Sequence, residues 1–508
     1  MQLEATRRTS RARVLCISPV CAAPRWDLRS LFRAGHPHFG QTAGGEHDHM
    51  QAGSEGRSVS TNTLKRLRGL LSRALGRGRE AALWQQMQKL HPWSYTPTHG
   101  IAWGRDGTSF PVVIDRARGC RIWDLRGKEY IDYTMGWGTT VLGYCHSEVQ
   151  KAVRSAMGSA PLLAYPRPIQ AEVQSLLERD FPGITGVAFG KNGSDVCTLA
   201  ARLCRGYTGR KTILYCGYHG WGDFWAEQHG FSRSSIPERH PALIHRFRFN
   251  DTGGFMALFE QHRSDLAGVM LEPSGPWGGN DIGCEPDADQ GFLETLRLAT
   301  RSVGALLVFD EIITGYRYLE GSVQRARGVT PDLTCLGKAI ASGMPLSALL
   351  ARGDIMQVAF GKAHYGPTFQ AEAWSFAAAK ATIEVFHREP VALHVWKQGE
   401  ALRQGIDEAL RVAGIPGHVK GPPFRMSICF GEEQGEIREL QRTLLQQEIL
   451  RLGVSIYNNG VMLPSYAHDD TTLERTLEVF RAALIIVGRA TRDGSLAAKI
   501  CIPLLREM

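Results

Sequence analysis

Two acidic residues, Asp310 and Glu311, end an apolar run in the stretch "GALLVFDEIITGYR", residues 304–317. The run is short, uninterrupted and preceded by glycine. This is typical of a strand buried on both faces of a parallel sheet, although a short buried helix fits the same pattern. In open α/β sheets, ligands bind at the carboxyl ends of the strands. We therefore expect the two acids to mark a ligand site.

Lys338 follows a second short apolar run, in "LTCLGKAIASGMP", 28 residues after Asp310. Taken alone, such a lysine is more often a surface residue. Paired with a carboxylate, it matches what pyridoxal phosphate requires: an amine for a Schiff base, and an acid that keeps the pyridine nitrogen protonated so that the ring accepts electrons. The pair therefore predicts a pyridoxal phosphate enzyme in which Lys338 and Asp310 are catalytic.

A seat for the phosphate group is predicted in "FGKNGSDVCTLAARLCRGYTGR". Asn192, Gly193, Ser194 and Asp195 stand at the start of a helical pattern, where free backbone N–H groups and the helix dipole bind anions. An ordinary N-cap explains the same residues, so the two interpretations stay open at this point.

Tyr218 and His219 follow another apolar run, in "CGYHGWGDFW". A tyrosine ring at this position would stack on the flat, electron-poor pyridine ring. In the simpler interpretation both are ordinary strand-end residues. Thr368, in "YGPTFQAEAW", adds a hydroxyl donor just before a helical run.

The elements that must position these residues follow from the apolar pattern. Short β-rich runs at 110–133, divided by two Arg-Gly pairs, indicate an antiparallel meander. Helical and apolar strand patterns then alternate to about residue 386, which is the signature of a parallel α/β layer fold. A long helix from about residue 389, weaker strands and a last helix at 471–487 indicate a second, smaller lobe.

A chain of 508 residues is too long for one hydrophobic core, so we expect several parts. The predicted parts are a basic N-terminal extension at 1–90 with a helix at 61–90, a segment with the β-meander at 91–135, a large cofactor-binding domain at 136–386, and a small C-terminal domain at 387–508. Residues 36–60 are rich in Gly, His and Ser and predict disorder.

The formal charge of +9 belongs to the N-terminal extension. Residues 1–90 contain 15 Lys and Arg and 6 Asp and Glu, which leaves 44 of each kind in the rest of the chain. The body of the protein therefore has no bulk electrostatic reason to bind nucleic acid or a membrane. A transit peptide within 1–35 fits the arginine content only weakly. We favour a disordered tail, or a true start at Met50.

The 11 cysteines are scattered singly, without a CxxC pair or a cluster with metal-ligand spacing. In a chain of this length the pattern favours reduced thiols in the cytoplasm over a disulfide framework, and it predicts no metal site. No apolar run approaches the roughly 18 residues of a membrane helix.

Taken together, the segments resemble the class III aminotransferases of pyridoxal phosphate fold type I, and most closely the branch similar to glutamate-1-semialdehyde aminomutase. The matching motifs, in order, are "WDLRGKEYIDY", "LGYCHSEV", "NGSD…AARLCRGYTGR", "YHG", "LEP", "FDEIITGYR", "GVTPDLTCLGKAI" and "PSYAH", over about residues 95–488. The resemblance implies a large domain with a mostly parallel sheet, a smaller C-terminal α+β domain, and a homodimer whose two active sites are each completed by the neighbouring subunit.

The resemblance also implies roles for individual residues. Lys338 would carry the cofactor as a Schiff base, Asp310 would hold the pyridinium, and Tyr218 would stack on the ring. Thr368 would bind phosphate across the dimer interface. The full cofactor-binding set implied is Gly193, Ser194, Tyr218, His219, Glu272, Asp310, Lys338 and Thr368.

Several departures favour an aminotransferase over the aminomutase. The segment after "YHG" lacks the glycine- and serine-rich gating loop that is usual in aminomutases, and "SIYNNGVMLPSYAH" lacks the acidic residue of their C-terminal lobe. After Glu272-Pro273, where relatives often place an amide near the cofactor's phenolic oxygen, stands "SGPWGGN". Either Asn280 or the Trp277 indole substitutes for the amide, or the contact is lost. Arg105 is the candidate for binding a substrate carboxylate, because a planar guanidinium matches one bidentately.

We thus expect amino transfer from L-glutamate to a carbonyl acceptor, in a polysaccharide or secondary-metabolite pathway. Two alternatives remain: intramolecular amino exchange of the aminomutase type, and a non-catalytic scaffold with the same fold. The sequence does not identify the acceptor.

Overall fold

The computed structural model describes residues 83, 113–222, 225, 243–276, 284–431, 435–457, 460–502 and 504. All of them belong to a compact unit formed by residues 65–508. Apart from residue 83, the helix predicted at 61–90 lies outside the described residues, as do Arg105, Trp277 and Asn280.

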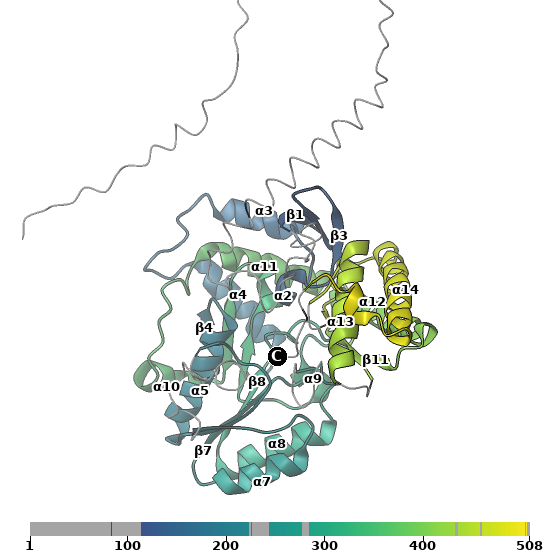
Figure 1. Cartoon of the computed structure of the whole chain (residues 1–508). Helices are drawn as coiled ribbons and strands as arrows, with labels where there is room; N and C mark the ends of the chain where they lie inside the picture. Colours follow the sequence, from purple (N-terminus) through teal and green to yellow (C-terminus); the bar gives the residue numbers. More distant parts are fainter. Residues whose placement is uncertain are drawn as a thin grey trace, which may run out of the picture. The chain divides into compact units, whose positions relative to one another are not determined.

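A seven-stranded sheet forms the centre of the larger lobe, with the strand order β4-β10-β9-β8-β7-β5-β6 (Figure 1). Strand β10 runs antiparallel to both of its neighbours, and the other adjacent pairs are parallel. The bounds are β4 Gly186–Gly190, β5 Thr212–Cys216, β6 Ile244–Arg246, β7 Leu266–Leu271, β8 Leu306–Asp310, β9 Leu333–Leu336 and β10 Ser347–Ala351. The predicted α/β fold with a mostly parallel sheet is confirmed, and the buried-helix alternative for 305–309 is excluded.

Strand β8 is buried on both faces, as its unbroken apolar sequence predicts. Leu306 and Val308 join the hydrophobic core on the α5 side of the sheet, whereas Leu307 and Phe309 join the core on the opposite side. Helices α5 and α10 pack on the first face, and α4, α7, α8 and α11 contribute to the second core (Figure 1). The helices of this lobe are α3 Ser147–Ala156, α4 Pro168–Asp180, α5 Gly193–Thr208, α7 Thr252–His262, α8 Gln290–Val303, α9 Val323–Arg327, α10 Gly353–Lys362 and α11 Ala373–Arg388, with the short 3-10 helix η5 at Lys338–Ala341.

A third hydrophobic core, separate from the two beside the large sheet, contains the C-terminal helices and the predicted β-meander. Strands β1, β2 and β3 pair antiparallel, and β13 adds to β3 in parallel. Tyr130, Ile131 and Tyr133 pack in the same core as α12, α13 and α14, so the meander is built into the C-terminal lobe. The bounds are β1 Ile114–Arg118, β2 Arg121–Asp124, β3 Glu129–Asp132, α2 Met135–Gly138, α12 Val391–Ala413, β11 Gly417–Lys420, β12 Met426–Phe430, α13 Gly435–Leu452, β13 Val454–Ser455, β14 Val461–Met462, α14 Asp470–Arg492 and α15 Leu496–Lys499.

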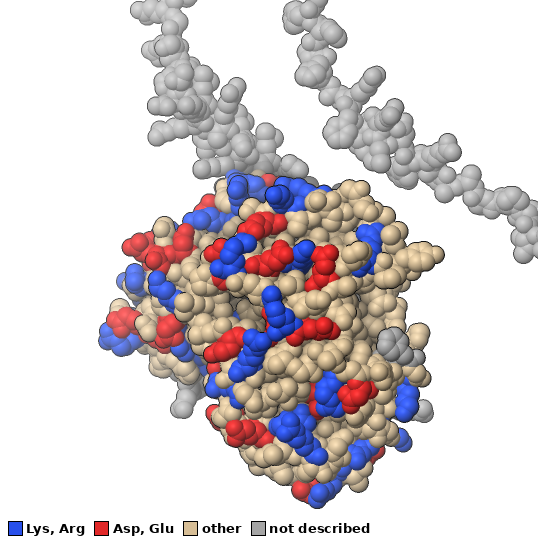
Figure 2. Space-filling model, turned by 180° about the vertical axis from the view of Figure 1, so that it is seen from behind, with Lys and Arg blue, Asp and Glu red and all other residues tan. Residues whose placement is uncertain are grey.

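The surface of the described part carries both signs of charge. Basic and acidic side chains are interspersed over the face seen in Figure 2. Among the helices that the structure describes, none combines the length and apolarity needed to cross a membrane.

Truncating the core of β8 tests this architecture. Leu307 is fully buried and Leu298, on α8, is 67% exposed. We expect Leu307→Ala to destabilise the protein by about 2–5 kcal/mol, because it leaves a cavity between sheet and helices. Leu298→Ala should change stability by no more than about 0.5 kcal/mol. Thermal unfolding followed by circular dichroism measures both. Equal losses in the two variants would contradict the buried position of β8.

Candidate active site

The candidate residues follow the carboxyl ends of adjacent parallel strands. Asp310 is the last residue of β8 and lies in register with Cys335 of β9. Lys338 begins η5, two residues after the end of β9. Glu272 follows β7, and Tyr218 follows β5 by two residues. The parallel arrangement therefore brings residues that are far apart in the sequence to one edge of the sheet.

Asp310 is buried and held by three donors. Its Oδ2 lies 2.8 Å from His219 Nδ1 and accepts from Cys197 Sγ at 3.5 Å. Its Oδ1 accepts the backbone N–H of Ile312 at 3.1 Å. Cys197, His219 and Asp310 place their potential ligand atoms within 4.8 Å of one another, and these hydrogen bonds account for that proximity. Donors of this kind stabilise the ionised carboxylate.

Glu311, the second acid, turns away from Asp310 into the following loop. Its Oε2 accepts from the backbone N–H of Val323 at 2.9 Å and from Thr314 Oγ1 at 3.1 Å. Burial raises its pKa to about 7. Of the adjacent acids, Asp310 therefore lies with His219 and Cys197, whereas Glu311 joins the end of β8 to the start of α9.

Lys338 is half-buried and has the left-handed backbone angle φ +43°. Such a conformation is strained for a residue with a side chain, and strain of this kind concentrates at functional sites. Burial and the nearby positive charge of Arg425 lower the pKa of the Lys338 amine to about 8. Glu272 and Asp310 act in the opposite direction. A large fraction of the amine is thus neutral near pH 8, as a nucleophile or a base must be.

Arg425 is the functional residue that the sequence interpretation missed. It lies just before β12, in "GPPFRMSICF", and is 6% exposed. Its Nη1 donates to Glu272 Oε1 at 3.2 Å, and this ion pair joins the C-terminal lobe to the end of β7. Glu272 Oε2 and His219 Nε2 are buried without a hydrogen-bond partner among the described residues. The only signal for Arg425 was a single charge in an otherwise apolar stretch.

The residues of the predicted anion seat lie at the start of helix α5. The helix is 16 residues long and begins at Gly193, where a Cβ atom would lie 2.6 Å from Ile312 Cδ1. A larger residue at position 193 would require the end of the Ile312 side chain, in the turn after β8, to move. Asp195 Oδ2 accepts the backbone N–H groups of Lys191 and Asn192 at 2.9 Å each, which ties the preceding turn to the helix.

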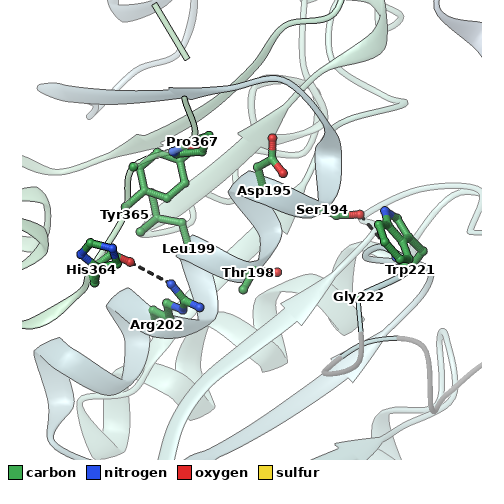
Figure 3. Close-up of a pocket in the computed structure, with 11 residues that line it drawn as sticks. Ser194, Asp195, Thr198, Leu199, Arg202, Trp221, Gly222, His364, Tyr365 and Pro367 are labelled. Atoms are coloured by element: carbon green, nitrogen blue, oxygen red, sulfur yellow. Dashed lines mark hydrogen bonds between the residues drawn. The ribbon is translucent and has the colours of Figure 1, made fainter. Parts of the chain in front are cut away.

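A cavity of about 330 Å³ opens beside this helix mouth. One wall is the α5 face that carries Ser194, Thr198 and Arg202, and the segment 364–367 lies opposite (Figure 3). The backbone N–H of Trp221 donates to Ser194 Oγ at 3.3 Å. Thr368 is exposed and is not among the described residues that line the cavity, so within one chain it does not complete the seat.

Tyr218 presents an aromatic ring near the carboxylates. It follows Gly217, which has φ +102°, and is 43% exposed. Partial burial raises the pKa of Tyr218, and the negative charges of Cys197, Glu272 and Asp310 act in the same direction. A partly exposed aromatic ring in the turn after β5 is of the kind that can stack on a flat ligand.

Comparisons with known proteins agree with this geometry. The family model described as "Aminotransferase class-III" matches residues 102–484. The chain belongs to the class III aminotransferases. It is 30% identical over 383 residues to the 3-aminobutyryl-CoA aminotransferase of Cloacimonas acidaminovorans, which covers 75% of this chain and 90% of the relative. It is 32% identical over 396 residues to the glutamate-1-semialdehyde 2,1-aminomutase 2 of Anoxybacillus flavithermus, with 73% and 90% covered.

Solved structures extend the likeness to the fold. The FumI protein of Sphingopyxis sp. MTA144, in its PLP internal aldimine form, superposes with a TM-score of 0.74 at 26% identity, covering 86% of this chain and 100% of that one. The expected family and fold type I are confirmed. This class III aminotransferase is an enzyme that uses pyridoxal phosphate.

The residues present fit that cofactor. The first turn of α5 offers backbone N–H groups and the Ser194 hydroxyl for a phosphate, and Asp310 offers a buried acid for a pyridinium nitrogen. Lys338 supplies an amine with a lowered pKa, and Tyr218 supplies a partly exposed aromatic ring. His219 Nε2 and Glu272 Oε2 are buried without a hydrogen-bond partner among the described residues, and the polar groups of a bound pyridine ring can supply such partners.

The pKa of Lys338 can be measured without the cofactor. Competitive acetylation of cofactor-free protein, followed across pH by mass spectrometry, reports the fraction of neutral amine. We expect reactivity at Lys338 to rise with a midpoint near pH 8, and not near the ordinary value of 10.5. In Arg425→Met the midpoint should move to higher pH, because a nearby positive charge is removed. A midpoint near 10.5 in the unaltered protein would contradict this description of the site.

Proposed function

We propose that this class III aminotransferase moves an amino group from L-glutamate to a carbonyl acceptor. The single observation that carries the proposal is the half-buried Lys338 amine, whose lowered pKa results from burial and Arg425, beside the hydrogen-bonded carboxylate of Asp310. This arrangement suits an amine that must be neutral and a carboxylate that must stay charged.

We assign the roles accordingly. When bound, pyridoxal phosphate acts as an electron sink for charge that develops at the substrate α-carbon. Lys338 Nζ holds the cofactor, and once free it takes the proton from the donor's α-carbon as a general base. Asp310, oriented by hydrogen bonds from His219 and Cys197, would hold the positive ring nitrogen. Tyr218 orients the ring by stacking on it.

The phosphate contacts are proposed at the mouth of α5. The N–H groups of the first turn and the Ser194 hydroxyl would hold the anion, and Gly193 allows the close approach. Thr368 would complete this seat from a neighbouring subunit, so we propose a homodimer. The site's substrates are small molecules.

Arg425 is the described residue best suited to bind a substrate carboxylate. Its guanidinium lies close enough to Lys338 to lower the pKa of that amine, and it is paired with Glu272 by a single 3.2 Å hydrogen bond. A carboxylate can replace Glu272 as its partner with bidentate geometry. Arg105, the candidate suggested by the sequence, stays a prediction.

The runner-up function is intramolecular amino exchange of the aminomutase type. Similarity to the aminomutase of Anoxybacillus flavithermus supports it, and the departures in the gating loop weigh against it. The cytoplasmic location and the polysaccharide or secondary-metabolite pathway are likewise proposals, and the acceptor is not identified.

The donor is tested with pyridoxal phosphate-loaded protein and L-glutamate alone. We expect the visible cofactor band to bleach with stoichiometric release of 2-oxoglutarate. Lys338→Ala should slow this half-reaction by at least about 10³-fold, because general acid–base catalysis contributes on this scale. Lys362→Ala, a lysine at the exposed end of α10, is the control and should react as the unaltered protein does. A coloured protein indifferent to glutamate would overturn the donor and favour the aminomutase reaction.

The role of Arg425 is tested by donors with and without a carboxylate. Arg425→Lys keeps the positive charge but loses the planar fork. We expect kcat/KM for L-glutamate to fall about ten- to a hundredfold, the worth of a charge-assisted hydrogen bond. Transfer from 1-phenylethylamine, which lacks a carboxylate, should be unchanged. Equal loss for both donors would show that Arg425 supports the fold and does not read the carboxylate.

A further inference from the structure

We propose that the ion pair between Lys191 and Glu372 is a positioning device that holds the Thr368 loop, residues 363–372, in a set place relative to the phosphate seat. The inference rests on the proposed function, because that function places the cofactor phosphate at the mouth of α5. Neither residue contacts the reacting atoms, so both are positioning residues.

The backbone that carries the Lys191 side chain is held in place by hydrogen bonds. Its own N–H and that of Asn192 are bound by Asp195, as described above. Ser347, which is fully buried at the start of β10, donates from its Oγ to the Asn192 carbonyl at 2.8 Å. The position of the Lys191 side chain therefore follows that of the helix mouth.

Glu372 receives this side chain at the other end of the loop. Lys191 Nζ donates to Glu372 Oε2 at 2.9 Å, and both side chains are only 13% exposed. The same carboxylate caps α11, because it accepts the backbone N–H of Trp374 and, at 2.6 Å, the hydroxyl of Ser375. The cap does not depend on Lys191, so removal of the lysine separates the loop from the seat without removing the cap of α11.

A second contact fixes the beginning of the loop. Tyr365 donates from its hydroxyl to the carbonyl of Phe189, next to the end of β4, at 2.8 Å. Tyr365 and Pro367 face α5 across the cavity in Figure 3. Thr368 and Phe369 lie between the two anchors, and both are exposed. The loop is therefore held at its ends while its tip is open to solvent.

This arrangement has a consequence for the two sites of a dimer. In the proposed dimer, Thr368 of one subunit completes the phosphate seat of the other subunit. The Lys191–Glu372 pair then sets the distance between a subunit's own phosphate seat and its own Thr368. Loss of the pair would then weaken binding of the phosphate group, and not binding of the pyridine ring.

The experiment compares two ligands that differ only in the phosphate. Cofactor-free protein is titrated with pyridoxal phosphate and with pyridoxal, followed by absorbance. We expect Lys191→Met to weaken affinity for pyridoxal phosphate by about tenfold or more, since small misplacements at a site are costly, and to leave affinity for pyridoxal unchanged. Lys191→Arg, which keeps the positive charge, should retain most of the affinity for pyridoxal phosphate. Glu372→Gln, which keeps an oxygen to cap α11, should reproduce Lys191→Met.

Lys380→Met is the matched control. It removes a lysine that pairs with Glu172 at 2.6 Å on the exposed side of the same helix, and both affinities should be unchanged. Unaltered affinity for pyridoxal phosphate in Lys191→Met would overturn the inference. So would equal loss of both affinities with a lower melting temperature, since the pair would then only stabilise α11. Failure of glutamate turnover in the unaltered protein would overturn the proposed function, whereas the phosphate-dependent difference is measured without turnover.

Discussion

A buried carboxylate that must find its hydrogen-bond partners within the protein is the constraint on which the rest of the site depends. Asp310 is 2% exposed, and His219, Cys197 and Ile312 each supply a hydrogen bond to its oxygens. These donors come from three separate segments, so the sheet, α5 and the turn after β5 must all be in place. The acid at the end of β8 is thus stabilised by the fold as a whole.

The Lys338 amine has the opposite requirement, because it must lose its proton easily to act as a nucleophile or a base. Burial and Arg425 lower its pKa, while Glu272 and Asp310 limit the shift. Arg425 comes from the C-terminal lobe and Glu272 from the end of β7, so the ion pair that joins the lobes also adjusts the amine. The Arg425–Glu272 pair, one of several contacts between the lobes, therefore also affects the Lys338 amine.

Much of the fold could be predicted because its signals are local. An unbroken apolar run bounded by glycine is a strand buried on both faces, and alternation of such runs with helical patterns leads to a parallel sheet. The antiparallel direction of β10 and the addition of β13 to β3 had no such signal. Both depend on pairings between distant segments, which local pattern does not encode.

The sequence by itself determined which chemical groups the site contains: an acid and a lysine at adjacent strand ends, and a helix start of the kind that binds anions. Its ordered motifs also identified the family. Only the tertiary structure decided which of two adjacent acids, Asp310 or Glu311, faces the site, because the turn after β8 sends their side chains in different directions. It alone brought Arg425 to Glu272, 153 residues apart, and Lys191 to Glu372, 181 residues apart. Charge pairing over such separations depends on how the layers pack, and no local period records it.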